Sequence, residues 1–280
     1  MMEAHGTYRP AWGATQITVS PHRGAIGSLM VRFYCPDLGI PVSADPACAP
    51  ASDHLVDLDP DQTHHARRVL RLGPGSRVEL FDGQGHEAPG TIDSFGPRAR
   101  VRVERIASLA RPSPRLDIAV AIPKGPRAQS MARTLSELGV DCIVPLRTDR
   151  SVVAPGQSLL NRFGRIAIES AKQCGRAYLM DVAKPAGVRE ILDADHDVRL
   201  ITTPEADPAR DPLAQVSRAR RILVLVGPEG GWTDRELRGA DDRGCVRWKL
   251  GSNILRIETA AAAAAAIVRA RCGPGTTPHD

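Results

Sequence analysis

One segment near the C-terminus restricts the possible folds more than any other. Residues 222–226 are all aliphatic, and they run directly into Gly-Pro-Glu-Gly-Gly at 227–231. An uninterrupted apolar strand is typical of a parallel sheet covered on both faces, and the strand-to-helix junctions of such sheets bind ligands. Thr233 and Glu236 have the spacing of a capping box that begins a helix. The segment therefore predicts a ligand-binding loop, although it matches neither the dinucleotide nor the triphosphate glycine motif.

The chain around this segment alternates between strand-like and helix-like patterns from residue 115 onward. Apolar runs separated by amphipathic stretches of helical period predict consecutive β-α-β units, and these imply a parallel sheet in an α/β domain. We expect strands at 116–122, 140–146, 198–203 and 221–226, and helices at 127–138, 160–174, 233–243 and over the alanine-rich segment that follows.

The preceding part of the chain has a different pattern. Short β-like runs at 30–35, 55–58, 77–81 and 99–106 alternate with turn signals, which predicts a small β-barrel over residues 30–110. Within it, residues 64–72 are expected to form one short amphipathic helix with Arg67, Arg68 and Arg71 near one face. That face is either solvated or directed at RNA. Pro112 and Pro114 indicate a linker between the two domains.

Composition limits the class of protein. The 280 residues carry a net charge of +5, and the sequence pI is about 9.1. This charge suits a polyanionic partner without requiring one. Six scattered cysteines with no C-x-x-C pair predict neither a zinc site nor a disulfide framework, and the adjacent His64 and His65 lack a third ligand. We therefore expect no metal.

The ends of the chain and its hydropathy also give expectations. No apolar run reaches the length of a membrane span, so we expect a soluble cytoplasmic protein with no membrane partner. Residues 1–29 have no periodicity and are expected to be a disordered extension. Residues 273–280 are expected to be a short tail.

A second motif lies near the end of the chain. An irregular polar loop, Leu250-Gly-Ser-Asn-Ile-Leu-Arg256, leads into a helix that contains seven successive alanines at 260–266. Alanine has the highest helix propensity, and a helix with so little side-chain bulk also lets another backbone or a partner subunit approach closely. We favour close packing as the reason for the alanines.

These two motifs resemble a known family. Gly-Pro-Glu-Gly-Gly at 227–231 and Leu-Gly-x-x-Ile-Leu-Arg-x-Glu-Thr-Ala at 250–260 are similar to the signature motifs of the 16S ribosomal RNA (uracil-N3)-methyltransferase family of the SPOUT superfamily. The resemblance covers residues 30–272, with departures at Thr134, Asn253 and Ile257. Further family-like positions occur in the expected order at Arg32-Phe33, His65, 69–71, Lys124-Gly125-x-Arg127, 137–140, 150–152 and 173–176.

The resemblance implies a fold and a reaction. The fold would be a PUA-like RNA-binding β-barrel followed by a SPOUT α/β domain over 115–272 with a C-terminal trefoil knot, in a homodimer. The reaction would be S-adenosyl-L-methionine-dependent methylation of N3 of a uridine in the 16S rRNA of the small ribosomal subunit. Three loops would form the cofactor pocket, through Thr202, Thr203, Gly227, Glu229, Gly230, Gly231, Leu250, Gly251, Ile254 and Leu255.

The resemblance also implies which residues act in catalysis and in RNA binding. Arg256 is expected to stabilise negative charge on the uracil oxygens, with a phosphate contact or an interface ion pair as the alternative. Glu229 is either the base or an orienting group, and a structural role beside a helix dipole is slightly favoured. For each expected RNA contact, solvated surface charge is the alternative reading. These expected contacts are Arg67, Arg68, Arg71, Lys124, Arg127, Arg150 and Arg176.

Two other functions compete with this one. A knotted methyltransferase could modify another rRNA nucleotide or a tRNA nucleotide, but the barrel ahead of the knot argues against that. A non-catalytic RNA-binding ribosome assembly factor is the alternative outside enzymes, and the intact motifs at 227–231 and 254–256 argue against it.

Overall fold

The computed structural model describes residues 30–38, 54–206 and 211–273. The predicted extension at 1–29 and the tail beyond Gly273 lie outside these ranges, as does Cys48.

The N-terminal part of the described chain forms a six-stranded sheet. Its strand order is β1-β3-β4-β5-β2 with β6 paired to β4, and β1 is parallel to β3 while the other pairs are antiparallel. The elements are β1 (Val31–Tyr34), β2 (Leu55–Asp57), α1 (Pro60–His64), the π-helical turn η1 (His65–Val69), β3 (Arg77–Phe81), β4 (His86–Phe95), β5 (Ala99–Val103) and β6 (Ala107–Ser108).

The helix predicted over 64–72 was wrong in its extent. The α-helix begins four residues earlier, because the Asp59 side chain caps it by accepting from the Gln62 N–H at 2.8 Å and Pro60 stands in the first turn. It ends at His64, and a π-helical turn follows. The alternation predicted over 99–106 is confirmed only as far as Val103: Ala99, Val101 and Val103 are buried and the residues between them are exposed, whereas Glu104 and Arg105 are both exposed.

The C-terminal part is an α/β domain, as predicted. Its seven-stranded sheet has the order β10-β8-β7-β12-β11-β13 with β9 paired to β8, and all of these pairs are parallel. The elements are β7 (Arg115–Ala121), α2 (Arg127–Glu137), β8 (Cys142–Arg147), α3 (Gln157–Cys174), β9 (Asp181–Val182), β10 (Ala186–Gly187), α4 (Val188–Leu192), β11 (Val198–Thr202), η2 (Val216–Arg218), β12 (Arg221–Val226), α5 (Asp234–Asp241), β13 (Val246–Trp248) and α6 (Ile257–Cys272).

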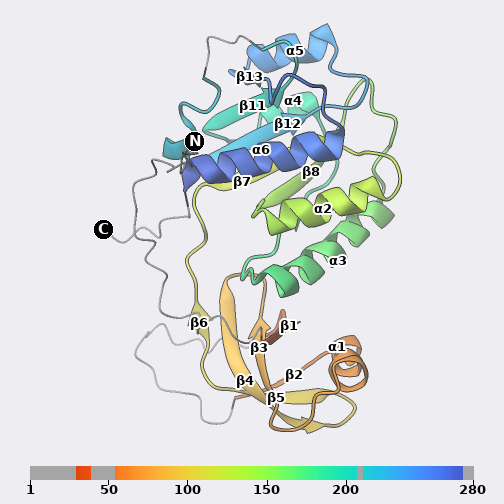
Figure 1. Ribbon diagram of the computed structural model, residues 1–280, viewed down its shortest axis with the longest axis vertical. Coiled ribbons are helices and arrows are strands. Elements are labelled where there is room, and N and C mark those ends of the chain that lie inside the picture. Colours follow the sequence, from red (N-terminus) through yellow and green to blue (C-terminus); the bar gives the residue numbers. More distant parts are fainter. Residues whose placement is uncertain (1–29, 39–53, 207–210, 274–280) are drawn as a thin grey trace, which may run out of the picture. The chain divides into compact units, whose positions relative to one another are not determined.

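Strand β12 explains why the apolar run at 222–226 shows no alternation. Ile222, Val224 and Val226 belong to a core cluster with residues of α2, α3 and α6, whereas Leu223 and Leu225 pack on the other face with residues of α4 and α5. Both faces of the strand are therefore covered. The alanine-rich helix α6 lies against α2 and across β7 and β12 (Figure 1), so the predicted close packing is found within the chain.

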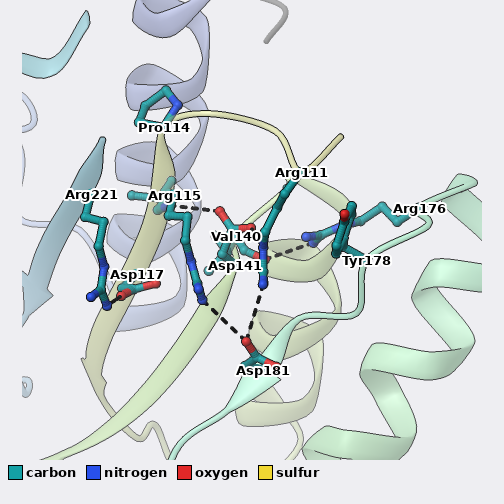
Figure 2. A network of polar contacts seen from close by, with 12 residues as sticks. Arg111, Pro114, Arg115, Asp117, Val140, Asp141, Arg176, Tyr178, Asp181 and Arg221 are labelled. Atoms are coloured by element: carbon teal, nitrogen blue, oxygen red, sulfur yellow. Dashed lines mark hydrogen bonds and ion pairs between the residues drawn. The ribbon is translucent and has the colours of Figure 1, made fainter. Parts of the chain in front are cut away.

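The N-terminal ends of the parallel strands carry a polar network (Figure 2). Asp141, which is 1% exposed, accepts from the Leu116 N–H at 2.9 Å and from Arg269 at 2.7 Å. Arg111 and Arg115 both reach the carboxylate of Asp181, at 3.5 and 3.4 Å. The segment ahead of β7 is thereby attached to β9 at the edge of the parallel sheet.

Candidate functional site

A cavity of about 580 Å³ lies at the C-terminal ends of β11, β12 and β13. The loops that follow the three strands line it, as expected for ligand sites of parallel sheets. The ten residues predicted to bind the cofactor all belong to this lining. We call residues 227–231 the glycine loop and residues 250–255 the second loop. Sequence reasoning missed other lining residues, among them Pro204, Glu205, Trp232, Trp248 and Lys249.

The glycine loop is held close to Trp232. A Cβ atom on Gly227 would lie 2.7 Å from the indole ring, and Gly231 has a φ of +71°, so both positions require glycine. The indole Nε1 donates to the carbonyl oxygen of Thr202 at 2.8 Å. Trp232 thus connects the loop after β12 to the end of β11.

The predicted capping box at the start of α5 is confirmed. The Thr233 side chain accepts from the Glu236 N–H at 3.3 Å, and the Thr233 N–H donates to the Glu236 carboxylate at 2.9 Å. The same carboxylate accepts from the Asp149 N–H at 3.0 Å. The buried Glu236 therefore attaches the loop between β8 and α3 to the helix that follows the glycine loop.

Arg150 also belongs to the loop between β8 and α3, and it lines the cavity. Its Nη1 donates to the carbonyl oxygens of Gly230 and Trp232, at 2.9 and 3.3 Å. The predicted RNA ligand therefore contacts the backbone beside the cofactor motif.

Arg127, at the start of α2, stands between two acidic residues. Its guanidinium lies 3.8 Å from Glu229 of the glycine loop and 3.7 Å from Glu258 of α6. Lys124, a few residues earlier, is exposed and forms no recorded ion pair within the described residues.

The second loop differs in that residues 251–254 are exposed, while Leu250 and Leu255 pack partly against the core. Ile254 is 94% exposed. Arg256 is the N-cap residue of α6 and is exposed, and no carboxylate in the described parts of the chain pairs with it. The Arg256 guanidinium is therefore available to a group from outside the chain.

Arg150 alone of the seven predicted RNA contacts belongs to the cavity lining, and Arg127 touches it through Glu229. Arg176 donates to the carbonyl oxygens of Ser136 and Val140 at 2.7 and 2.9 Å, the second of which Figure 2 shows. Burial lowers the pKa of its guanidinium, an effect that Asp141 opposes. Arg67, Arg68 and Arg71 are exposed on η1 and just after it. The structure thus brings Arg127 and Arg150, but not these four, to the candidate site.

Within the described residues, no group of three or more His, Cys, Asp or Glu side chains is arranged to hold a metal ion. Among the same residues, no helix is both long and apolar enough to cross a membrane.

Family models match both parts of the chain. A model described as an RNA methyltransferase PUA domain matches residues 58–97, and one described as an RNA methyltransferase domain matches residues 111–269. The ribosomal RNA small subunit methyltransferase E of Synechocystis sp. is 31% identical over 220 residues, which cover 77% of this chain and 73% of the relative.

Solved structures give the same result. A ribosomal RNA small subunit methyltransferase E from Neisseria gonorrhoeae, bound to S-adenosyl methionine, superposes with a TM-score of 0.72 at 29% identity, over 85% of this chain and 96% of that one. A methyltransferase from Legionella pneumophila in complex with the cofactor SAM has a TM-score of 0.71 at 28% identity, over 86% and 97% of the two chains. The chain therefore belongs to the RNA methyltransferase family that includes the ribosomal RNA small subunit methyltransferase E proteins.

Proposed function

We propose that this protein transfers a methyl group from S-adenosylmethionine to N3 of a uridine in the 16S rRNA of the small ribosomal subunit. The observation that carries the proposal is the cavity at which the loops after β11, β12 and β13 meet. The relatives named ribosomal RNA small subunit methyltransferase E, and the two similar structures that hold the cofactor, support the same reaction.

The residues around the cavity fit this cofactor. Its volume of about 580 Å³ is within the usual range of ~300–1,000 Å³ for small-molecule sites. Trp248 and Leu250 offer apolar walls, and the glycine loop offers backbone N–H groups. Thr202, Thr203, Gly227, Gly230, Gly231, Gly251, Ile254 and Leu255 would complete the binding site. S-adenosylmethionine would supply a methyl group on a positively charged sulfur.

Arg256 is proposed to act on the uracil. N3 becomes nucleophilic only after it loses its proton, and the resulting negative charge spreads to the two carbonyl oxygens. A guanidinium stabilises such charge with directed N–H donors. The exposure of Arg256 beside the cavity and the absence of a recorded carboxylate partner among the described residues support this role.

Glu229 has a different environment. Its carboxylate stands 3.8 Å from the guanidinium of Arg127. The same guanidinium lies 3.7 Å from Glu258 of α6, so the contact links the glycine loop to the start of that helix. We therefore favour an orienting role for Glu229 over the role of catalytic base.

The finer features of the fold belong to the proposal as well. Strand β13 lies at the sheet edge beside β11, whereas α6 packs on β7 and β12, so residues 249–256 pass the glycine loop. This crossing supports a C-terminal trefoil knot in a SPOUT domain over 115–272. We further propose that residues 30–110 form a PUA-like barrel, that Arg67, Arg68, Arg71 and Lys124 bind rRNA phosphates, and that the enzyme acts as a cytoplasmic homodimer.

Methyl transfer to purified small subunits from cells that lack the activity tests the proposal, with mass spectrometry of the product nucleosides. The expected product is 3-methyluridine. Another methylated nucleoside would retain the enzyme class and change the substrate. No transfer, together with no cofactor binding, would favour the non-catalytic assembly factor.

A further inference from the structure

We propose that Arg150 and Arg127 are positioning residues that hold the glycine loop in its cofactor-binding form, and that they are not RNA ligands. The inference rests on the proposed function, because it assumes that the loop binds S-adenosylmethionine. It predicts that loss of either arginine weakens binding of the cofactor.

The contacts of Arg150 determine the direction of peptide groups in the loop. In a planar trans peptide the C=O and the following N–H point in opposite directions. The bonds from Arg150 to the Gly230 and Trp232 carbonyls therefore also orient the N–H groups of Gly231 and Thr233. Gly231 N–H donates to the Pro228 carbonyl at 2.9 Å, and Thr233 N–H donates to Glu236 at 2.9 Å.

This arrangement leaves three donors in the loop. Within the described residues, the N–H groups of Gly227, Glu229 and Gly230 donate to no acceptor of the chain. All three residues line the cavity. The loop is thus held by its own hydrogen bonds and by Arg150, while these three N–H groups remain available to a ligand.

The Arg150 side chain also packs against the loop. A Cβ atom at Gly230 would lie 3.3 Å from the Cβ of Arg150 and 3.5 Å from its Cδ. The absence of a side chain at Gly230 therefore lets the arginine lie close to the backbone. This contact gives a reason for glycine at position 230, where φ is not positive.

The segment that carries Arg150 is itself anchored. The carboxylate of the preceding residue, Asp149, accepts from Thr233 Oγ1 at 3.0 Å and from Arg235 at 2.8 Å. Together with the bond from Asp149 N–H to Glu236, these contacts join the loop between β8 and α3 to the start of α5. Arg150 thus extends to the glycine loop from a segment whose backbone is held in place by hydrogen bonds.

Arg127 acts on another part of the site. Its guanidinium connects Glu229 in the glycine loop with Glu258 in the first turn of α6. One oxygen of Glu258, Oε2, is buried and has no hydrogen-bond partner among the described residues. Arg127 lies 3.7 Å from the other oxygen, Oε1, and it links the glycine loop to the helix that begins after Arg256.

An RNA phosphate would have to compete with these in-chain partners for either arginine. Arg256 and Lys124 have no such competitors within the described residues, so they are better placed to bind the nucleic acid. Loss of Arg150 should therefore weaken cofactor binding and leave the electrostatic part of RNA binding unchanged.

Calorimetric titration with S-adenosylmethionine tests the inference on the full chain and its variants. We expect Arg150→Ala to raise the cofactor Kd about tenfold, since it removes two hydrogen bonds from a charged donor. Arg150→Lys should recover part of the loss, because an ammonium can still reach one carbonyl. Arg127→Ala should raise the Kd about threefold, because both ion pairs are partly exposed. Arg133→Ala, an exposed position on the same helix as Arg127, is the matched control and should leave the Kd unchanged.

Two further readouts separate positioning from general damage and from RNA contact. In methyl transfer, Arg150→Ala should raise KM for the cofactor while kcat stays within about twofold; partial unfolding would instead lower the apparent kcat by reducing the active fraction. In binding to 16S rRNA, the slope of log affinity against log salt should not change, whereas loss of a phosphate contact would reduce it by about 0.7–0.9.

Each outcome decides between the alternatives. A wild-type protein that binds cofactor, with an unchanged Kd in Arg150→Ala, would overturn this inference alone. A reduced salt slope with unchanged cofactor affinity would restore Arg150 as an RNA ligand. A wild-type protein that binds no cofactor would overturn the proposed function and this inference with it.

Discussion

The two ends of the parallel sheet are both rich in arginine, but they use it differently. At the N-terminal ends of the strands, the buried Asp141 accepts from Arg269 and from Leu116 N–H, and Asp117 pairs with His196 at 2.9 Å. At the C-terminal ends, three backbone N–H groups of the glycine loop donate to no acceptor, and Arg256 pairs with no carboxylate, among the described residues. We call the N-terminal end, where the carboxylates are paired within the chain, the closed end, and the C-terminal end the open end.

This difference shows that the partners of an arginine, and not its presence in a motif, indicate its role. Arg176 and Arg256 both stand in family-like motifs. Arg176 donates to the carbonyls at the end of α2 and before β8, whereas Arg256 is exposed beside the cavity. The comparison predicts that variants at the closed end change stability and that variants at the open end change activity.

The largest effect is expected from Asp141→Ala at the closed end. Removing one partner of a buried ion pair leaves the other charge uncompensated, which costs about 4 kcal/mol of unfolding free energy. Urea denaturation followed by circular dichroism measures this loss. Asp193→Ala, which removes an exposed ion pair with Arg243, is the control and should have little effect. Equal stability of the Asp141 variant and the wild type would contradict the closed-end account.

Arg256→Ala should have the next largest effect, at the open end. We expect methyl transfer to fall about 100-fold, as for the loss of one preorganised donor to a developing negative charge, while cofactor Kd and stability stay unchanged. Single-turnover transfer from labelled S-adenosylmethionine measures the rate. Arg238→Ala, exposed on α5, is the control. Full activity of the Arg256 variant would remove it from the catalytic site.

Gly230→Val sharpens the comparison within the open end. Its Cβ would lie 3.3 Å from the Cβ of Arg150, and the branched side chain would displace the arginine from the loop. We expect at least a tenfold loss of cofactor affinity in calorimetry. Gly164→Ala in α3, where a Cβ meets no atom within 4 Å, serves as the control. Normal binding by the Gly230 variant would argue against a cofactor role for the loop.

The smallest effect is a pH dependence at the closed end. Burial tends to raise the pKa of Asp117, but the hydrogen bond and charge of His196 and the charges of Arg115 and Arg221 outweigh it, so the pKa is lowered from its usual 3.8. A depressed folded-state pKa contributes stability above the unfolded-state value, and that stability is lost as the pH falls through the folded-state value. Asp117→Asn should therefore lose less stability than the wild type between about pH 5 and pH 3.

Urea midpoints at both pH values measure this difference. Parallel acid dependence of the variant and the wild type would show that Asp117 does not contribute to it.

Much of the fold could be predicted because its signals are local. The apolar strand β12, the capping box of Thr233 and the alternation in β5 each depend on neighbouring residues. Strand β4 was missed because Pro89 and Gly90 interrupt its β pattern, and β9, β10 and β13 are too short to show a period. The start of α1 was missed although Asp59 and Pro60 form a recognisable cap.

The candidate site shows the same limit. The glycines and the order of the motifs led to ten expected cofactor-binding residues, and all ten line the cavity. The partners of Arg150 and Arg176 are backbone carbonyls about 80 and 40 residues away in sequence. A backbone carbonyl has no residue type, so no pattern in the sequence indicates such a bond.

Titration of the wild-type protein with S-adenosylmethionine tests the central claim most directly, namely that the open end of the sheet is a cofactor pocket. The account predicts saturable binding of one molecule per chain that the Gly230→Val exchange weakens and the Asp141→Ala exchange does not. Absence of binding in the presence of small ribosomal subunits, or equal binding by wild type and Gly230→Val, would contradict it.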